Sequence, residues 1–193
     1  MGKISNSFRI MQEKFGDPKP DQTGDMLGVW PAQGEHECYL THIEVDENHD
    51  FFIKKTKDQR FTCKGTSIRF WYQLTNDPDN PDNPLSWGGQ PFQFPDELTD
   101  DFEDGKLTML RMDRNRMCGH LKCLLGVDVG GTTGMPEDEA LDQVKEKLNG
   151  DTETICIVKA QYSKGKKKPD ADGVMPDKAP EYRKEFLLKL IGT

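Results

Sequence analysis

Apolar and polar residues alternate over the first half of the chain with the two-residue period of β-strands. Turn-forming clusters separate the alternating runs at 46–50 and 57–59, and Gly65 marks a bulge or bend. The predicted strands cover 35–45, 51–56, 60–63 and 66–74. Because the turns between them are short, we expect these strands to form an antiparallel meander.

The next segment cannot continue the sheet. Pro, Asn and Asp alternate over 76–84, and each proline removes a backbone donor and restrains the residue before it. We therefore expect a long loop that continues through Trp87 to Pro91. Phe92 and Phe94 are expected to return the chain to the core.

Helical spacing begins after this loop. A short helix capped at its first residue is predicted over 96–102. Apolar residues that recur every three or four positions predict a second helix over 106–125, with a break near Gly119. Pro136 and Gly150 have the positions typical of a helix start and a helix stop, which predicts a third helix between them.

The end of the chain alternates again, which predicts strands over 152–163 and 182–191 joined by a basic, flexible loop over 164–180. Three or four strands, a helical insertion and two further strands make a mainly β fold. We predict an OB-like Greek-key β-barrel of antiparallel strands, with an α+β sandwich as the alternative.

A single OB-like domain is expected to span 29–193, because the preceding residues contain glycines and prolines that interrupt any periodicity. Residues 1–28 are predicted to be a flexible N-terminal segment. Four apolar residues within it allow a short helix or a docking segment instead. These residues are Phe8, Ile10, Met11 and Phe15.

Composition narrows the functional classes. Hydrophobic residues make up 34% of the 193 residues, and no apolar stretch approaches the roughly 18 residues of a membrane span. The N-terminus also lacks the apolar core of a signal peptide. We therefore expect a cytoplasmic protein without a membrane partner. Five cysteines without paired spacing are expected to be reduced thiols.

The net charge of −8 argues against nucleic-acid binding, but the charges are distributed unevenly. Residues 76–104 form an acidic segment with nine acids and no Lys or Arg. The segments 51–72, 106–123 and 159–193 each carry a net positive charge. Because a polyanion responds to the field near one face, basic faces can coexist with an acidic whole.

Catalytic and metal-binding motifs are weak. Residues 125–134 resemble the phosphate loop of sugar kinases, but too little chain follows for the two large domains of those enzymes. Cys118, His120 and Cys123 supply three potential zinc ligands, whereas a structural site needs four. No catalytic triad or tuned pair of carboxylates can be identified. We therefore predict a protein that is not an enzyme and holds no metal or cofactor.

The strongest candidate site is an aromatic and basic sheet face. Alternation over 66–74 puts Arg69 and Trp71 on the face opposite Ile68 and Phe70. Single-stranded nucleic-acid binding uses aromatic rings to stack on bases and cations to follow phosphates. The alternative is that a helix covers Trp71 in a second core. The predicted nucleic-acid-binding residues are Phe52, Lys54, Lys55, Arg60, Arg69, Trp71, Lys164, Lys166, Lys167 and Lys168.

The order of these features resembles the phage-encoded single-stranded-DNA-binding-like proteins of replication and recombination modules. The resemblance covers residues 30–191. It rests on the Pro-x-x-Gly entry at 31–34, the lysine-rich hairpin, the strand at 68–74, the Cys-Leu-Leu-Gly run at 123–126, the Leu-Asn-Gly helix end at 148–150 and the strand at 155–160.

The resemblance implies an OB-fold and sequence-independent, non-catalytic binding of single-stranded DNA in replication, recombination or repair. Its implied partners are single-stranded DNA, replication or recombination proteins, and a second copy of the chain. Many such proteins end in an acidic tail that recruits partners. This chain ends without one, and two roles stay open for the acidic segment 76–104: a substitute for the tail, or a mimic of DNA that blocks the groove.

Two rival functions stay open. One is a phage structural or adaptor protein that acts through protein contacts, and the other is a β-sandwich that binds carbohydrate through Trp71 and Trp87. Salt dependence separates them from DNA binding, because phosphate contacts release counterions and the other contacts largely do not.

Overall fold

A computed structural model of the chain describes residues 3–18, 31–55, 60–99, 102, 104–149, 153–167, 175 and 181–192. Within these residues, one antiparallel sheet has the strand order β3-β2-β1-β5-β6, and β4 also pairs with β2. The strands are β1 (Gly34–Lys55), β2 (Arg60–Leu74), β3 (Ser86–Gly88), β4 (Phe92–Pro95), β5 (Ile155–Lys164) and β6 (Glu181–Gly192). The helices are α1 (Lys3–Phe15), α2 (Asp104–Leu125) and α3 (Glu137–Asn149).

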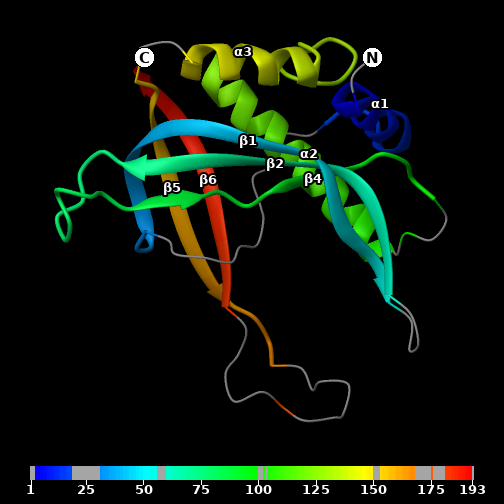
Figure 1. Cartoon of the computed structure of the whole chain (residues 1–193), viewed down its shortest axis with the longest axis horizontal. Coiled ribbons are helices and arrows are strands. Elements are labelled where there is room, and N and C mark those ends of the chain that lie inside the picture. The colour runs from blue at the N-terminus through cyan, green and yellow to red at the C-terminus, as the bar shows by residue number, and fades with distance from the viewer. Residues whose placement is uncertain are drawn as a thin grey trace.

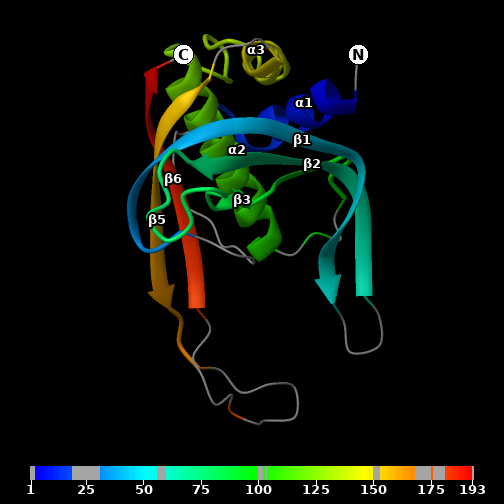
Figure 2. The ribbon, with the colours of Figure 1, turned by 60° about the vertical axis from the view of Figure 1, so that its left-hand side comes forward.

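The sheet is strongly curved, and β1 and β2 arch over α2 (Figures 1 and 2). The expected mainly antiparallel β fold with inserted helices is confirmed. A closed Greek-key barrel is not confirmed, because the described ladders leave the sheet open between β3 and β6.

The first predicted turn is wrong. Residues 46–50 do not reverse the chain but lie inside β1, which runs for 22 residues against β2. Asp46 pairs with Ser67 and His49 pairs with Gly65, so β1 contains one more residue than β2 between these pairs. The cluster therefore forms a bulge, in which Asp46 Oδ1 accepts from the backbone N–H of Asn48 at 3.0 Å.

Gly65 is required by a close approach of β4. A Cβ atom there would lie 2.2 Å from the carbonyl oxygen of Phe94 and 2.7 Å from the ring of Phe51. Gly65, where a bulge or bend was predicted, is thus a residue of β2 at which β1 and β4 pair on its two sides, and the extra residue of the bulge lies on β1.

The loop predicted over 76–84 is present, and Asp77 organises it. The Asp77 carboxylate accepts hydrogen bonds from the backbone N–H groups of Asp79 and Leu85. After the loop, the chain returns to the sheet as β3. Residues 86–88 are therefore a strand and not part of the loop. Phe92 and Phe94 are 0% and 1% exposed, as expected for residues that return to the core.

Two of the helical predictions need correction. Residues 96–99 and 102 are not helical, because the backbone N–H of Asp96 instead extends the sheet by donating to the carbonyl of Lys64. The helix over 106–125 is confirmed as α2, but it is unbroken at Gly119, which is buried. The third helix is confirmed as α3, directly after Pro136.

The N-terminal helix, one of the two alternatives to a flexible segment, is present as α1. Phe8 and Met11 are buried, and the Phe8 ring packs edge-on against Phe94 with centroids 5.0 Å apart. Residues 3–15 are therefore docked on the core. Residues 1–2 and 19–28 of the predicted flexible segment lie outside the described residues, as does most of the basic loop 164–180.

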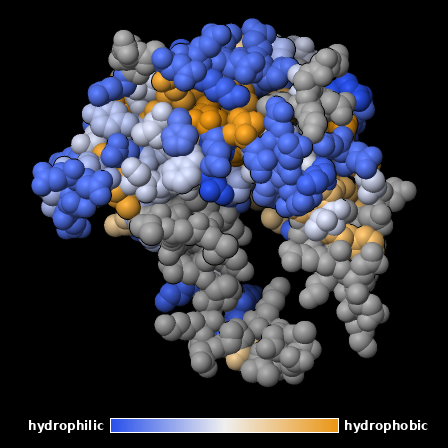
Figure 3. All heavy atoms as spheres, in the orientation of Figure 1, coloured by the Kyte–Doolittle hydropathy of each residue, from blue (hydrophilic) through white to orange (hydrophobic). Residues whose placement is uncertain are grey.

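The last two predicted strands are confirmed as β5 and β6, and Cys156, Val158 and Ala160 form the buried face of β5. The five cysteines are free thiols, as expected. None of the helices in the described part of the chain is long and apolar enough to cross a membrane. The described part of the face seen in Figure 3 is mostly hydrophilic.

Candidate nucleic-acid interface

The two faces of β2 differ as the alternation predicted. Ile68, Phe70 and Tyr72 are fully buried against the helices, whereas Arg69 and Trp71 are half-buried on the opposite, outer face. Phe70 contacts the ring of His120 on α2, which fixes the inner face. The alternative that Trp71 belongs to a second, helix-covered core is therefore not what the structure shows.

Neighbours from β1 hold the Trp71 ring on the outer face. His42, its cross-strand partner, lies parallel to it with ring centroids 5.4 Å apart and an interplanar angle of 9°. Trp71 Nε1 donates a hydrogen bond to Glu44 Oε2 at 2.9 Å. The guanidinium carbon of Arg69 lies 6.0 Å from the ring centroid. Trp71 thus forms a fixed aromatic surface with a cation beside it.

Strand β3 leaves room for this pair of side chains. Gly88 lies opposite Trp71, and a Cβ atom at Gly88 would lie 2.7 Å from Arg69 Cδ and 3.1 Å from the Trp71 ring. The two side chains therefore lie close against the β3 backbone, and a larger residue at position 88 would have to displace them. The contact of Gly88 with this site was not predicted from the sequence, because the residues around Gly88 were expected to form a loop.

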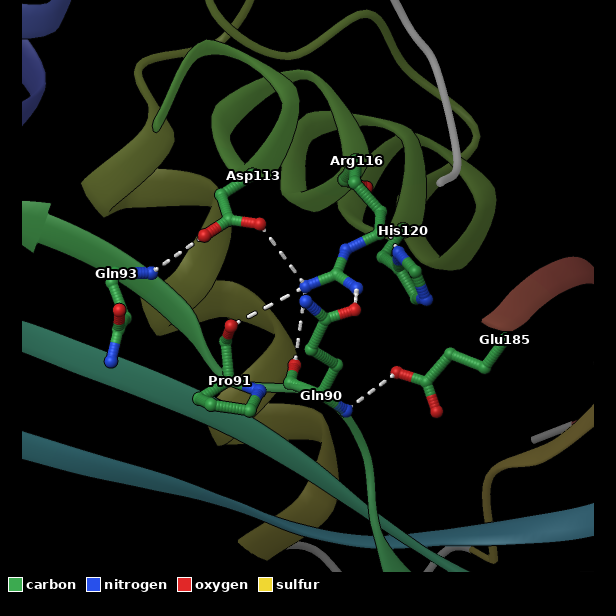
Figure 4. Close-up of polar contacts among 7 residues, drawn as sticks. All are labelled: Gln90, Pro91, Gln93, Asp113, Arg116, His120 and Glu185. Atoms are coloured by element: carbon green, nitrogen blue, oxygen red, sulfur yellow. Dashed lines mark hydrogen bonds and ion pairs between the residues drawn. The ribbon is translucent and has the colours of Figure 1, made fainter. Parts of the chain in front are cut away.

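A buried polar network holds the segment that follows Gly88 (Figure 4). Gly89 N–H donates to the Phe70 carbonyl at 2.7 Å, and Gln90 N–H donates to Glu185 Oε1 at 3.2 Å. The Arg116 guanidinium donates to the Gln90 side-chain oxygen and reaches the Gln90 and Pro91 carbonyls at 3.4 Å. Side chains from α2 and β6 thereby fix the β3 to β4 connection next to the outer-face site.

Burial sets the protonation behaviour of this network. Desolvation raises the pKa of Glu185 to about 7 although the Arg116 charge and the Gln90 hydrogen bond oppose it. Desolvation likewise raises the pKa of Asp113 to about 6 against the nearby Arg116. The pKa of His120 is lowered to about 3 by desolvation, and its Nδ1 lies 2.8 Å from the Arg116 carbonyl. His120 is therefore a neutral core residue that donates from Nδ1.

Metal binding at the Cys118, His120 and Cys123 cluster finds no support in this geometry. His120 lies between the rings of Phe70 and Phe92, and burial raises the pKa of the Cys118 thiol to about 12. Among the described residues, no group of three or more His, Cys, Asp and Glu side chains could hold a metal ion.

Apart from Arg69 and Trp71, the candidates belong to two groups at strand ends, one on β1 and β2 and one at the end of β5. The distal ends of β1 and β2, at Lys55 and Arg60, point the same way as the ends of β5 and β6, at Lys164 and Glu181 (Figure 2). The side chains of four candidates on the first pair of strands lie outside the described residues. They are Phe52, Lys54, Lys55 and Arg60.

At the end of β5 and just beyond it, Lys164, Lys166 and Lys167 are exposed, and Lys168 lies outside the described residues. The structure therefore brings Arg69 and Trp71 together in one site. It separates them from the lysines of residues 164–167, which belong to the end of the sheet.

The predicted carbohydrate pair cannot form. Trp87 is 2% exposed and packs with Tyr72 on the inner face, with ring centroids 5.5 Å apart. Trp71 lies on the outer face, so the sheet separates the two indole rings.

The sequence reading also missed His42 and Glu44, which complete the outer-face site. Pairing the predicted strand at 35–45 with the strand at 66–74 would have suggested them, but a one-residue bulge after Leu40 shifts the register there.

A comparison with models of protein families, with curated proteins and with solved structures found no match to this chain.

Proposed function

We propose that this chain binds single-stranded DNA without requiring a particular sequence, as a non-catalytic component of replication, recombination or repair. The observation that carries the proposal is the Trp71 ring, held half-exposed on a sheet face with Arg69 beside it. Such rings stack on any base, and a neighbouring cation attracts the phosphates. Pre-positioning of the ring by His42 and Glu44 lowers the entropy lost on binding.

An OB-like interpretation of the sheet supports the same site. OB-folds are partly open barrels that bind oligonucleotides on the face of their second and third strands and through two flanking loops. Strands β2 and β3 carry Trp71, Arg69 and Gly88. The connections of β1 to β2 and of β5 to β6 would supply the flanking loops; the first contains one lysine, Lys57, and the second contains four. In this interpretation the Gln90 to Glu185 hydrogen bond bridges the open side of the barrel.

Charge determines how such binding would depend on salt. The whole chain carries −8, and Glu44 and Asp46 lie on the outer face, so the basic ends of the sheet would be the main source of long-range attraction. We therefore expect modest affinity at physiological salt and a steep gain at low salt.

The test is a fluorescence anisotropy titration of a labelled deoxythymidine dodecamer with the wild-type chain and the Trp71→Ala variant at low salt. The proposal expects binding by the wild type, quenching of tryptophan fluorescence, and weaker binding by the variant. Equal affinity of the two proteins would remove Trp71 from the site.

A second candidate function, protein docking by a structural or adaptor protein, is favoured by strand β6. This strand lies at the edge of the sheet and exposes Leu188 (42%) and Ile191 (47%). Long edge strands with exposed apolar residues tend to pair with another chain. Light scattering after size exclusion tests the simplest form of this candidate: a dimer that Leu188→Lys dissociates would favour it, and a monomer at all concentrations would count against self-pairing.

A further inference from the structure

A pocket of about 180 Å³ lies on the outer face beside the Trp71 site. Its base is made by two cross-strand pairs, Glu44 with Arg69 and Asp46 with Ser67. The bulge in β1 brings His49 to the same rim, where its Nε2 lies 3.0 Å from Gln93 Nε2. The pocket therefore exists because residues 46–49 form a bulge instead of a turn.

The two carboxylates of the pocket differ in how they are engaged. Asp46 uses Oδ1 for the backbone of Asn48, and its Oδ2 lies 3.4 Å from His49 Nδ1. Glu44 uses Oε2 for the Trp71 indole, and within the described part of the chain its Oε1 has no hydrogen-bond partner. Arg69 Nε is buried without a hydrogen-bond partner among the described residues. Glu44 thus keeps one carboxylate oxygen free, and the guanidinium of its cross-strand partner Arg69 has no hydrogen bond or ion pair with the described residues.

This combination disfavours a phosphate inside the pocket, because its two carboxylates outnumber its one arginine; Arg69 can attract a phosphate only outside the pocket. It suits a neutral ring whose edge offers adjacent N–H donors next to a carbonyl oxygen. Among the bases, guanine offers N1–H and the N2 amino group beside O6, whereas thymine offers one donor between two acceptors. Arginine is a common donor to guanine O6, and unpaired bases are read on their Watson–Crick edges.

We propose that this pocket binds the Watson–Crick edge of an unpaired guanine, with Glu44 accepting from the base and Arg69 donating to O6. The inference rests on the proposed DNA-binding function and adds one base-preferring position to binding that otherwise tolerates any sequence. Trp71 lies next to the pocket through its hydrogen bond to Glu44, so it can stack on the same or the adjoining base.

The experiment compares two labelled probes by anisotropy at low salt: a deoxythymidine dodecamer and the same strand with one central deoxyguanosine. We expect the wild type to bind the guanine probe about fivefold to tenfold more tightly. Glu44→Gln should lose this preference, since an amide presents a single acceptor oxygen. Glu37→Gln is the matched control, because it removes one exposed charge from the same strand outside the pocket.

The ratio of the two affinities separates base recognition from general electrostatics. If Glu44 acts only through its charge, Glu44→Gln raises the affinity for both probes equally and leaves their ratio unchanged. If Glu44 binds the base, the ratio falls toward one. Equal binding of the two probes by the wild type would overturn the guanine pocket and leave the DNA-binding function standing. A preference that survives Glu44→Gln would overturn the assignment to Glu44. Failure of the wild type to bind either probe would overturn both proposals.

Discussion

Trp71 donates its indole N–H to Glu44 Oε2 across the β1–β2 ladder at 2.9 Å. The bond fixes the orientation of an aromatic ring on the outer face of the sheet, where His42 covers part of it and Arg69 lies beside it. A half-buried tryptophan held in this way has paid much of its rotamer entropy on folding, which favours its use as a binding surface.

Trp71→Ala should weaken DNA binding more than it weakens the fold. Stacking of one base on an aromatic ring contributes about 1–3 kcal/mol, so we expect a roughly tenfold loss of affinity for oligo-deoxythymidine. Phe70→Ala is the matched control on the opposite face, where the side chain is 0% exposed. It should lower the free energy of unfolding by about 3–5 kcal/mol.

Denaturant unfolding and anisotropy titration of the two variants check this contrast. If Trp71→Ala unfolded as easily as Phe70→Ala and still bound DNA normally, Trp71 would be a structural residue.

The exposed lysines at the end of β5 should contribute electrostatic attraction without base preference. Replacing Lys164, Lys166 and Lys167 by Ala should weaken binding to all single strands alike. Each lost phosphate contact should also reduce the slope of log affinity against log salt by about 0.7. The measurement is a salt titration of binding for the wild type and the triple variant. Identical affinities and salt slopes would show that these lysines do not contact the DNA.

Glu185→Gln should change how stability depends on pH. Burial raises the pKa of Glu185 from 4.5 to about 7, so the folded state holds this proton more tightly than the unfolded state. The resulting stabilisation is complete below about pH 4.5 and is lost as the pH rises to about 7. Gln keeps the acceptor for Gln90 N–H without the charge. The variant should therefore gain about 3 kcal/mol relative to the wild type between these pH values.

Denaturant unfolding of both proteins at a series of pH values tests this effect. Taking the difference between them is necessary because His120, with its pKa lowered to about 3, acts in the opposite direction below pH 6.5. A difference that stays constant with pH would show that Glu185 is ionised in the folded protein throughout this range.

Gly65→Ala should destabilise the fold, whereas Gly105→Ala should stabilise it. The added Cβ at Gly65 would lie 2.2 Å from the Phe94 backbone oxygen, and strands cannot separate there without breaking ladder contacts. We expect a loss of about 2 kcal/mol or more. Gly105 lies in the first turn of α2 with nothing within 4 Å of such a Cβ, so alanine should add up to about 1 kcal/mol through its helix propensity. Thermal unfolding of the pair measures both, and a Gly65→Ala protein as stable as the wild type would contradict the close approach of β4 to β2 at Gly65.

The hydrophobic pattern was sufficient to predict elements whose apolar residues recur with one regular spacing, either that of a strand or that of a helix. The alternation through Phe70 and Trp71 gave the two faces of β2 correctly, and the apolar spacing over α2 gave its length. The failure at residues 46–50 is instructive, because Asp, Asn and His favour turns and bulges for the same reason: their side chains bond to nearby backbone groups. Only the pairing of β1 with β2 over its full length decides between the two.

The buried network was beyond the reach of sequence patterns. Arg116 and Glu185 are 0% and 1% exposed, although charged residues at these positions predict a solvated surface. Their burial depends on Gln90, which comes from a different part of the chain and supplies the hydrogen bonds that both side chains need. Long-range partners of this kind leave no periodic signal.

The most direct test of the central claim is the affinity of the wild-type chain for a labelled deoxythymidine dodecamer, measured by anisotropy at about 50 and 200 mM salt. Binding through phosphates and stacking predicts saturable binding at the lower salt, accompanied by tryptophan quenching, and an affinity about tenfold or more weaker at the higher salt. No binding at the lower salt, or an affinity indifferent to salt, would contradict a single-stranded-DNA interface on this sheet.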